Sequence, residues 1–178
     1  MAPRFRFKLL PITLLTIIQI WGPIAVVRSQ SIEGTQSSEI TQKNSNNEQL
    51  KQLVRQLKST DPLVRLRAAF VLGGIGESAK SSIPDLILLF KDPDAGVRSS
   101  AAYVLGSMGE SAKSDIPDLI PLLKDPNKSV RSSVSYALGR IGVSAKSAIP
   151  NLISLLKDPY PEVQSNAADA LEELGYKP

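Results

Sequence analysis

Few side chains in this 178-residue chain are of the types that carry out catalysis. The sequence has no histidine and no cysteine, so imidazole bases, thiolate nucleophiles, disulfides and the common ligands of zinc and iron are missing. Asp115 and Asp118, three residues apart, can present two carboxylates on one helix face, as general acid–base chemistry requires. No base, nucleophile or phosphate-binding glycine loop accompanies them. We therefore predict a protein that is not an enzyme, with no catalytic residue, metal site or cofactor.

The positive charge of the chain is concentrated near its start. Lys and Arg number 21 against 17 Asp and Glu, which gives a net charge of +4. The whole excess lies before residue 29, where four basic residues and no acidic residue occur. The remainder is formally neutral and lacks the basic patch that phosphate binding requires, so we predict no nucleic-acid partner.

The N-terminal residues have the pattern of an export signal. Three basic residues within 1–8 precede an uncharged apolar run, LLPITLLTIIQIWGPIAVV, over residues 9–27. Val27 and Ser29 then occupy the small-residue positions of a cleavage site. This order predicts a signal peptide over residues 1–29.

An uncleaved membrane anchor is the alternative, since the apolar run nearly spans a bilayer. Pro11 and Pro23 within the run argue against the anchor. In both cases the basic residues stay on the inner side, so we expect the rest of the chain in an extracytoplasmic compartment: secreted, periplasmic or lumenal. Contact with a membrane is expected only through a retained leader.

A polar segment, QSIEGTQSSEITQKNSNN, follows over residues 30–47. It has almost no large apolar side chains, so burial cannot offset the entropy that ordering would cost. We predict a flexible linker here, followed by one folded region over residues 48–178.

The folded region repeats itself every 33 residues without an insertion. Four short motifs keep this period, which chance does not explain, and the region is therefore a repeat array. The motifs are Lys-Asp-Pro from Lys91, Lys124 and Lys157, Val-Arg from Val64, Val97 and Val130, Leu-Gly from Leu72, Leu105 and Leu138, and Ile-Pro from Ile83, Ile116 and Ile149.

Each repeat is predicted to hold two helices. In the first helix, Asp92 is expected to cap the N-terminus, with Pro93 at the first helical position, and Gly106 and Gly109 mark the end. The second helix begins at Ser114 or Asp115 as cap, with a proline in its first turn. Apolar residues at helical spacing give each helix one buried face. For the first helix these are Val97, Ala101, Val104, Leu105 and Met108, and for the second Ile116, Leu119, Ile120 and Leu123.

The array begins and ends with single helices. Residues 48–58 match a second helix, and the last unit is a first helix with nothing after it, which gives about eight helices. In this last helix Asp169 replaces an aromatic residue and Glu172 replaces a glycine, as expected of a polar end cap. One unit buries too little apolar surface to offset its ordering entropy, so we expect repeats to fold only when stacked.

The repeat has features of one known family. The tryptophan of tetratricopeptide repeats and the Thr-Pro-Leu-His motif of ankyrin repeats are absent from the array. The sequences DPDAGVRSSAAYVLGSMG and IPDLIPLLKDP resemble short HEAT repeats of the phycobilisome lyase type, over about residues 48–175. This resemblance implies an all-α fold, a right-handed α-α superhelix (α-solenoid), with first helices on the convex side and second helices lining the concave side.

The resemblance also suggests functions. Similar proteins include phycobilin lyases, deoxyhypusine hydroxylases that bind iron through His-Glu pairs, and adaptors without catalysis. Without histidine, the iron site cannot form here. The lyases are larger and act in the cytoplasm, which disagrees with the leader. We predict a protein-binding scaffold, with a lyase-like or chaperone-like subunit for phycobilin attachment as the alternative.

Residues on the second helices are the candidates for partner binding. Two positions vary between repeats while their neighbours stay uniform, and Leu88 and Pro121 would place apolar surface where a partner peptide lies. Two other recurring sets are expected to be structural: the Asp and Arg of neighbouring repeats, and the aromatic series Phe70, Tyr103 and Tyr136, for which stacking around a flat ligand is the alternative. The partner-binding candidates are Arg55, Asp85, Leu88, Asp118, Pro121, Asn151 and Ser154.

Overall fold

The computed structural model describes residue 44 and residues 46–177. Residues 47–178 form one compact unit, whose described part contains helices and turns and no strand. Among the described residues, no helix combines the length and apolar character needed to cross a membrane. The predicted signal peptide and nearly all of the predicted linker lie outside the described residues. The three described residues of that linker, 44, 46 and 47, are helical.

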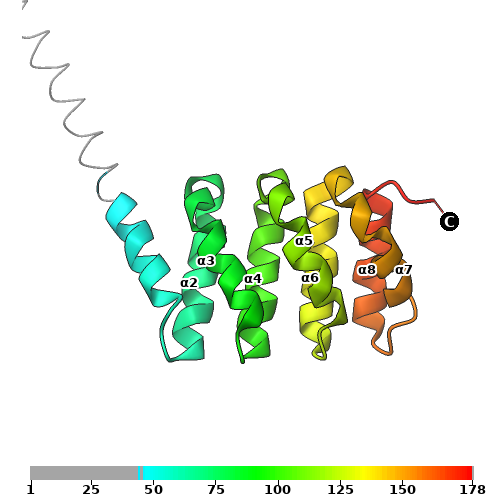
Figure 1. Cartoon of the computed structure of the whole chain (residues 1–178), viewed down its shortest axis with the longest axis horizontal. Coiled ribbons are helices and arrows are strands. Elements are labelled where there is room, and N and C mark those ends of the chain that lie inside the picture. The colour runs from blue at the N-terminus through cyan, green and yellow to red at the C-terminus, as the bar shows by residue number, and fades with distance from the viewer. Residues whose placement is uncertain (1–43, 45, 178) are drawn as a thin grey trace, which may run out of the picture. The chain divides into compact units, whose positions relative to one another are not determined.

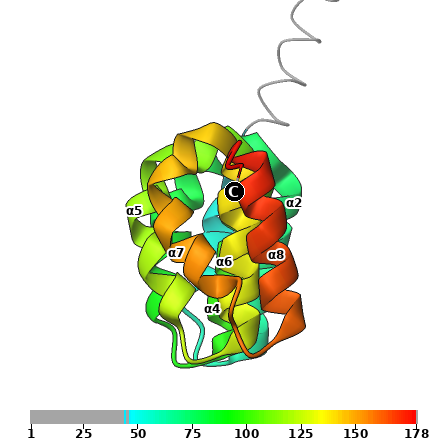
Figure 2. The ribbon, with the colours of Figure 1, turned by 90° about the vertical axis from the view of Figure 1, so that its right-hand side faces the viewer.

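The helices form two layers (Figures 1 and 2). The first helices of the repeats lie side by side in one layer and the second helices in the other. The first helices are α2 (Pro62–Ile75), α4 (Ala95–Ser107), α6 (Lys128–Ile141) and α8 (Pro161–Glu173). The second helices are residues 46–56, α3 (Ile83–Leu88) with η2 (Leu89–Lys91), α5 (Ile116–Leu119) with η4 (Ile120–Lys124), and α7 (Ile149–Leu155).

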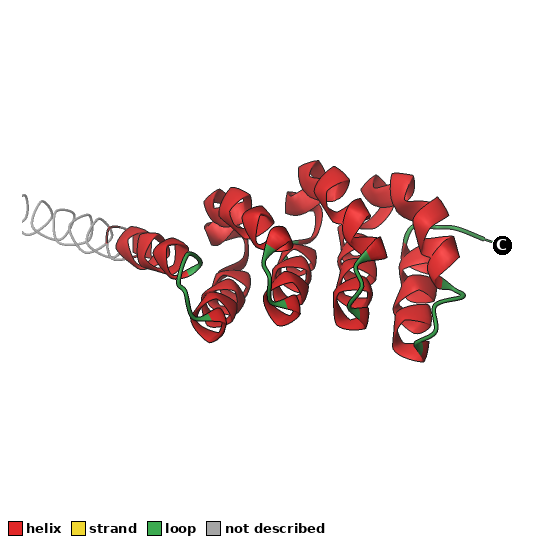
Figure 3. Cartoon of the chain, turned by 60° about the horizontal axis from the view of Figure 1, so that its bottom comes forward, coloured by secondary structure: helices red, strands yellow, loops and turns green. Residues whose placement is uncertain are grey.

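Short 3₁₀ helices join the two helices of each repeat, and open loops join one repeat to the next (Figure 3). The joining helices are η1 (Gly76–Ser82), η3 (Gly109–Asp115) and η5 (Gly142–Ala148). Each begins with a glycine at positive φ, for example 56° at Gly109, a conformation that other residues rarely adopt. The all-α solenoid fold predicted from the sequence is confirmed.

The core is built from the same positions in successive repeats. Leu72, Leu105 and Leu138 of the first helices are fully buried, and so are Leu86, Leu119 and Leu152 of the second helices. Burying a leucine contributes about 1.5–3 kcal/mol, so these positions stabilise the stack more than any surface contact. Phe90 is the one aromatic residue among the buried apolar side chains of the described residues.

Glycine sets the distance between first helices. Gly106 lies inside α4, where a Cβ would come within 2.6 Å of the Cα atom of Ala137 in α6. Gly139 approaches Ala170 of α8 in the same way. Gly106 is the last residue but one of α4, close to the predicted end, and it also permits close packing. Gly109 follows the end of the helix. In α8 the equivalent residue is the exposed Glu172, which is polar as expected for this helix.

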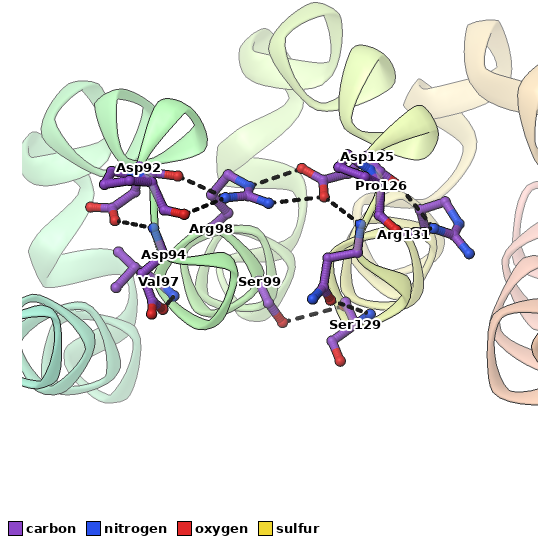
Figure 4. A network of polar contacts seen from close by, with 11 residues as sticks. Asp92, Asp94, Val97, Arg98, Ser99, Asp125, Pro126, Ser129 and Arg131 are labelled. Carbon is purple, nitrogen blue, oxygen red and sulfur yellow. Dashed lines mark hydrogen bonds and ion pairs between the residues drawn. The ribbon is translucent and has the colours of Figure 1, made fainter.

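Arginine and aspartate side chains connect neighbouring repeats (Figure 4). Nε and Nη2 of Arg98 donate to Asp125 of the next repeat at 2.8 and 3.0 Å, while Nη1 donates to the carbonyl of Asp92 at 2.8 Å. We call this series the arginine–aspartate ladder. It consists of Arg65–Asp92, Arg98–Asp125 and Arg131–Asp158.

The ladder corrects the predicted helix cap. Asp92 does not cap α4, because its carboxylate accepts from Arg65 and from the backbone N–H of Asp94. The cap is Asp94, whose Oδ1 accepts from the N–H of Val97 at 3.0 Å. The predicted structural role of the recurring Asp and Arg residues is confirmed, with the bonds running between repeats.

The ladder carboxylates are nearly buried, with side chains 5–7% exposed. Burial alone raises the pKa of Asp92 and Asp125, but hydrogen bonds from an arginine and from a backbone N–H more than compensate and hold both pKa values below the usual one. For Asp158 the hydrogen bond from Arg131 is the main cause of a lowered pKa. All three carboxylates are therefore ionised at neutral pH.

Candidate protein-binding surface

Some exposed residues of the second helices line a groove between two neighbouring repeats. The groove has a volume of about 390 Å³ and lies between α3 with η2 and α5 with η4. Three of the seven predicted partner-binding residues, Leu88, Asp118 and Pro121, line it. We call it the second-helix groove. Its other lining residues include Ile87, Lys91 and Lys124.

Leu88 is the most exposed large apolar residue in the groove, with 65% of its surface accessible. Its neighbours Leu86 and Leu89 are buried in the core, so the helix turns Leu88 outward. Pro121 on η4 is also exposed and lines the groove beside Leu88. An outward leucine beside an outward proline gives the groove an apolar centre.

The other four predicted residues lie elsewhere on the second helices. Asp85 forms an ion pair with Lys58 at 3.3 Å, which links the first two second helices. Arg55 lines a separate hollow of about 510 Å³ near the start of the array. Asn151 and Ser154 lie on α7, where the hydroxyl of Ser154 donates to a backbone carbonyl. The candidates therefore share one layer of helices, but they do not form one continuous site.

Sequence reasoning did not select a row of lysines beside the groove. A lysine lies at the end of each second helix or in the turn just after it, and all four lysines are exposed. The Lys-Asp-Pro motif was the available signal for three of them, because only its aspartate is used in the ladder, and Lys58 occupies the same repeat position without that motif. The row consists of Lys58, Lys91, Lys124 and Lys157.

The carboxylate pair considered for catalysis does not face a common opening. Asp115 is buried while Asp118 is exposed in the groove. Burial raises the pKa of Asp115, whose Oδ2 has no hydrogen-bond partner. Asp115 makes no side-chain cap bond either, because η3 runs directly into α5. The described residues include no cluster of acidic side chains able to hold a metal ion.

The aromatic series forms a stack along the first helices. Ring centroids of Tyr103 and Tyr136 are 5.1 Å apart and nearly parallel, and those of Phe70 and Tyr103 are 6.2 Å apart and tilted. The rings therefore pack against one another. The spacing between neighbouring rings is too small for a flat ligand to insert. The stack agrees with a packing role.

Two layers of repeated helix pairs with an open second-helix face define an α-solenoid repeat protein. A model of HEAT repeats matches residues 50–119 and 116–178. The chain belongs to the HEAT repeat family. No curated protein matches the sequence significantly.

Solved structures with the same fold include designed and natural repeat proteins. An engineered protein is 25% identical, with a TM-score of 0.60 over 73% of this chain and 64% of the other. A designed armadillo repeat protein in complex with the peptide (KR)4 is 21% identical, with a TM-score of 0.63 over 75% and 67%. The complex of CpcE and CpcF of phycocyanin lyase from Nostoc sp. is 23% identical, with a TM-score of 0.50 over 70% and 64%. The chain spans less than two thirds of the first two engineered proteins.

Proposed function

We propose that this chain is a non-catalytic scaffold that binds another protein on the face formed by its second helices. The observation that carries the proposal is the exposure of Leu88 in the second-helix groove, which Pro121 also lines. An apolar centre with charged edges is typical of a surface that takes an extended segment of a partner. The HEAT repeat fold supports this role, because its side-by-side helices offer a long continuous surface.

A pull-down tests the binding face. The bait is the folded unit, compared with a Leu88→Glu/Pro121→Glu variant and with Leu63→Glu, whose leucine is 64% exposed at the start of α2 on the other layer. We expect Leu63→Glu to capture the same partner as the unchanged protein, and the groove variant to lose it. Identical capture by all three proteins would rule out the groove.

We further propose that the scaffold works outside the cytoplasm. The basic start and apolar run of residues 1–27 support export. Sequencing the N-terminus of the protein purified from its own cells tests this. A start at Gln30 supports cleavage, a start at Met1 or Ala2 together with membrane fractionation supports an anchor, and recovery of the uncleaved chain in the cytoplasmic fraction contradicts export.

A second candidate function is a lyase-like or chaperone-like role in phycobilin attachment, with repeats of the phycobilisome lyase type. Its support is the structural similarity to the CpcE and CpcF complex of phycocyanin lyase. The test mixes the purified chain with a phycobilin and an apo-phycobiliprotein. Covalent pigment on the acceptor above the level without this chain would favour this function over simple scaffolding.

A further inference from the structure

The lysine row gives the second-helix groove a positive edge. Lys91 and Lys124 line the groove together with Leu88 and Pro121. Within the described residues, only Lys58 of the row has an ion pair across repeats, with Asp85. Lys91 and Lys124 form no ion pair with another described residue, so their charges stay available to a partner.

The acidic side chains of the groove do not balance this charge. Asp125 lines the groove, but its carboxylate is occupied by Arg98 of the ladder. Asp118 is then the one lining carboxylate without an arginine. Two free ammonium groups against one free carboxylate leave a positive surplus beside the apolar centre.

The spacing along each helix orders these groups. Asp85, Leu88 and Lys91 are three residues apart in succession, which places them along one outward face of the second helix. Successive repeats set their second helices side by side (Figure 3). In the groove, Leu88 and Lys91 of one repeat therefore lie next to Pro121 and Lys124, which occupy the same positions of the following repeat. A segment that crosses the helices would meet apolar surface and positive charge together.

We propose, building on the proposed function, that the groove binds an extended acidic segment of a protein partner, with an apolar side chain over Leu88 and Pro121 and carboxylates toward Lys91 and Lys124. Opposite charge at the edge favours this segment, and like charge disfavours a basic one. The designed armadillo repeat protein with similar fold was solved with the basic peptide (KR)4. The lysines of this chain select the opposite charge.

Fluorescence anisotropy with labelled octapeptides tests the proposal. The protein is residues 47–178, a compact unit that contains the whole described core. The probes are alternating Glu-Leu, alternating Lys-Leu and alternating Glu-Ser. We expect the Glu-Leu peptide to bind measurably and the other two peptides not to bind. The affinity for the Glu-Leu peptide should fall as ionic strength rises from about 0.05 to about 0.5 M.

Two charge-reversal variants locate the contact. Lys91→Glu/Lys124→Glu should weaken Glu-Leu binding about tenfold or more, because two attractions become repulsions. Arg67→Glu/Lys146→Glu changes the net charge equally at exposed positions outside the groove and should weaken it less than about threefold. Circular dichroism confirms that both variants fold.

Three results would overturn the acidic assignment: Lys-Leu binding as tightly as Glu-Leu, no binding of Glu-Leu, or equal losses in the two variants. These results differ from failure of the proposed function. If Lys-Leu binds and Leu88→Glu abolishes that binding, the groove still takes a peptide but not an acidic one. If Leu88→Glu/Pro121→Glu also captures the same partner as the unchanged protein in the pull-down, the partner does not bind at the groove, and the proposed function fails.

Discussion

Arg131 donates to both carboxylate oxygens of Asp158, at 2.7 and 3.0 Å, although the two residues are 27 positions apart in consecutive repeats. The same guanidinium also donates to the carbonyl of Asp125 in its own repeat, at 2.8 Å. One side chain thus connects two loops and one helix. The described interfaces between successive first helices all contain this arrangement, from Arg65 to Asp158.

Removing one arginine of the ladder should destabilise the array strongly. In Arg98→Ala, the carboxylate of Asp125 keeps its backbone bond to Asn127 but loses its charged partner while it stays buried. We expect a loss of about 2–4 kcal/mol in the free energy of unfolding, measured by urea denaturation. Arg67→Ala, at an exposed arginine of α2, is the control and should change it by less than about 0.5 kcal/mol. Equal effects would mean that the ladder does not stabilise the stack.

The ladder also predicts sensitivity to acid. Its aspartates have lower pKa values in the folded protein than in the unfolded chain, where the value is about 3.9. The unfolded state therefore binds more protons in acid. The stabilisation is complete above about pH 5 and is lost as pH falls through the lowered pKa values. Urea unfolding from pH 7 down to pH 2.5 should show this fall, and Arg98→Ala should show a smaller one.

The contribution of Asp115 to stability should change with pH in the direction opposite to that of the ladder aspartates. Burial raises its pKa, so the folded protein holds this proton more tightly than the unfolded chain does, and ionisation costs stability as pH rises above about 4. The next repeat has Ala148 at this position, fully buried. We expect Asp115→Ala to stabilise the protein by about 1–2 kcal/mol at pH 7, because an unpartnered buried carboxylate oxygen is removed. The gain should disappear below about pH 4, and a loss at pH 7 would show that Asp115 has a partner in solution.

Replacing a glycine of the first helices with alanine should destabilise the protein at Gly106 and stabilise it at Gly74. In Gly106→Ala the new methyl group meets the backbone of Ala137 at 2.6 Å, so α4 and α6 must separate. We expect a net loss of about 1–2 kcal/mol despite the better helix propensity. Gly74 of α2 has open space around it, and Gly74→Ala should add about 0.5–1 kcal/mol. Thermal unfolding of the pair measures both, and a stabilised Gly106→Ala would refute close packing at this site.

An isolated repeat should not fold. A peptide of residues 95–127 keeps α4, α5 and the ladder residues Arg98 and Asp125, but it loses both neighbouring first helices. Because its apolar faces would remain in water, we expect little helical circular dichroism and no cooperative melting. A peptide with full helix content and a sharp transition would show that the units are independent.

The repeat period was enough to predict the fold, because each 33-residue unit contains the same two apolar faces and the same glycines. Local rules could not place the helix cap. Asp92 and Asp94 flank the same proline and both types suit a cap, so local preference does not choose between them. The choice depends on Arg65, which reaches Asp92 from the previous repeat. Contacts between repeats of this kind are not visible in helix propensities.

The candidate surface was predicted only in part. Variation between repeats identified Leu88 and Pro121, because the core positions beside them do not vary. It could not separate Asp118, which lines the groove, from Asp85, which is paired with Lys58. It also passed over the lysines, since they are identical in every repeat. A uniform residue is as compatible with a surface role as a variable one, and only the arrangement of helices distinguishes them.

The ladder determines where further repeats can be added to the array. Each arginine of the ladder donates to the aspartate of the following repeat. The series stops at Gln164, whose side chain donates to the carbonyl of Asp158 in its own repeat. A duplicated copy of residues 95–127, inserted in register, would supply its own arginine and aspartate and would join both neighbours without any redesign. Arrays of other lengths are therefore accessible through internal duplication of genetic material, while addition beyond the last helix would require replacing Gln164 and Glu172 first.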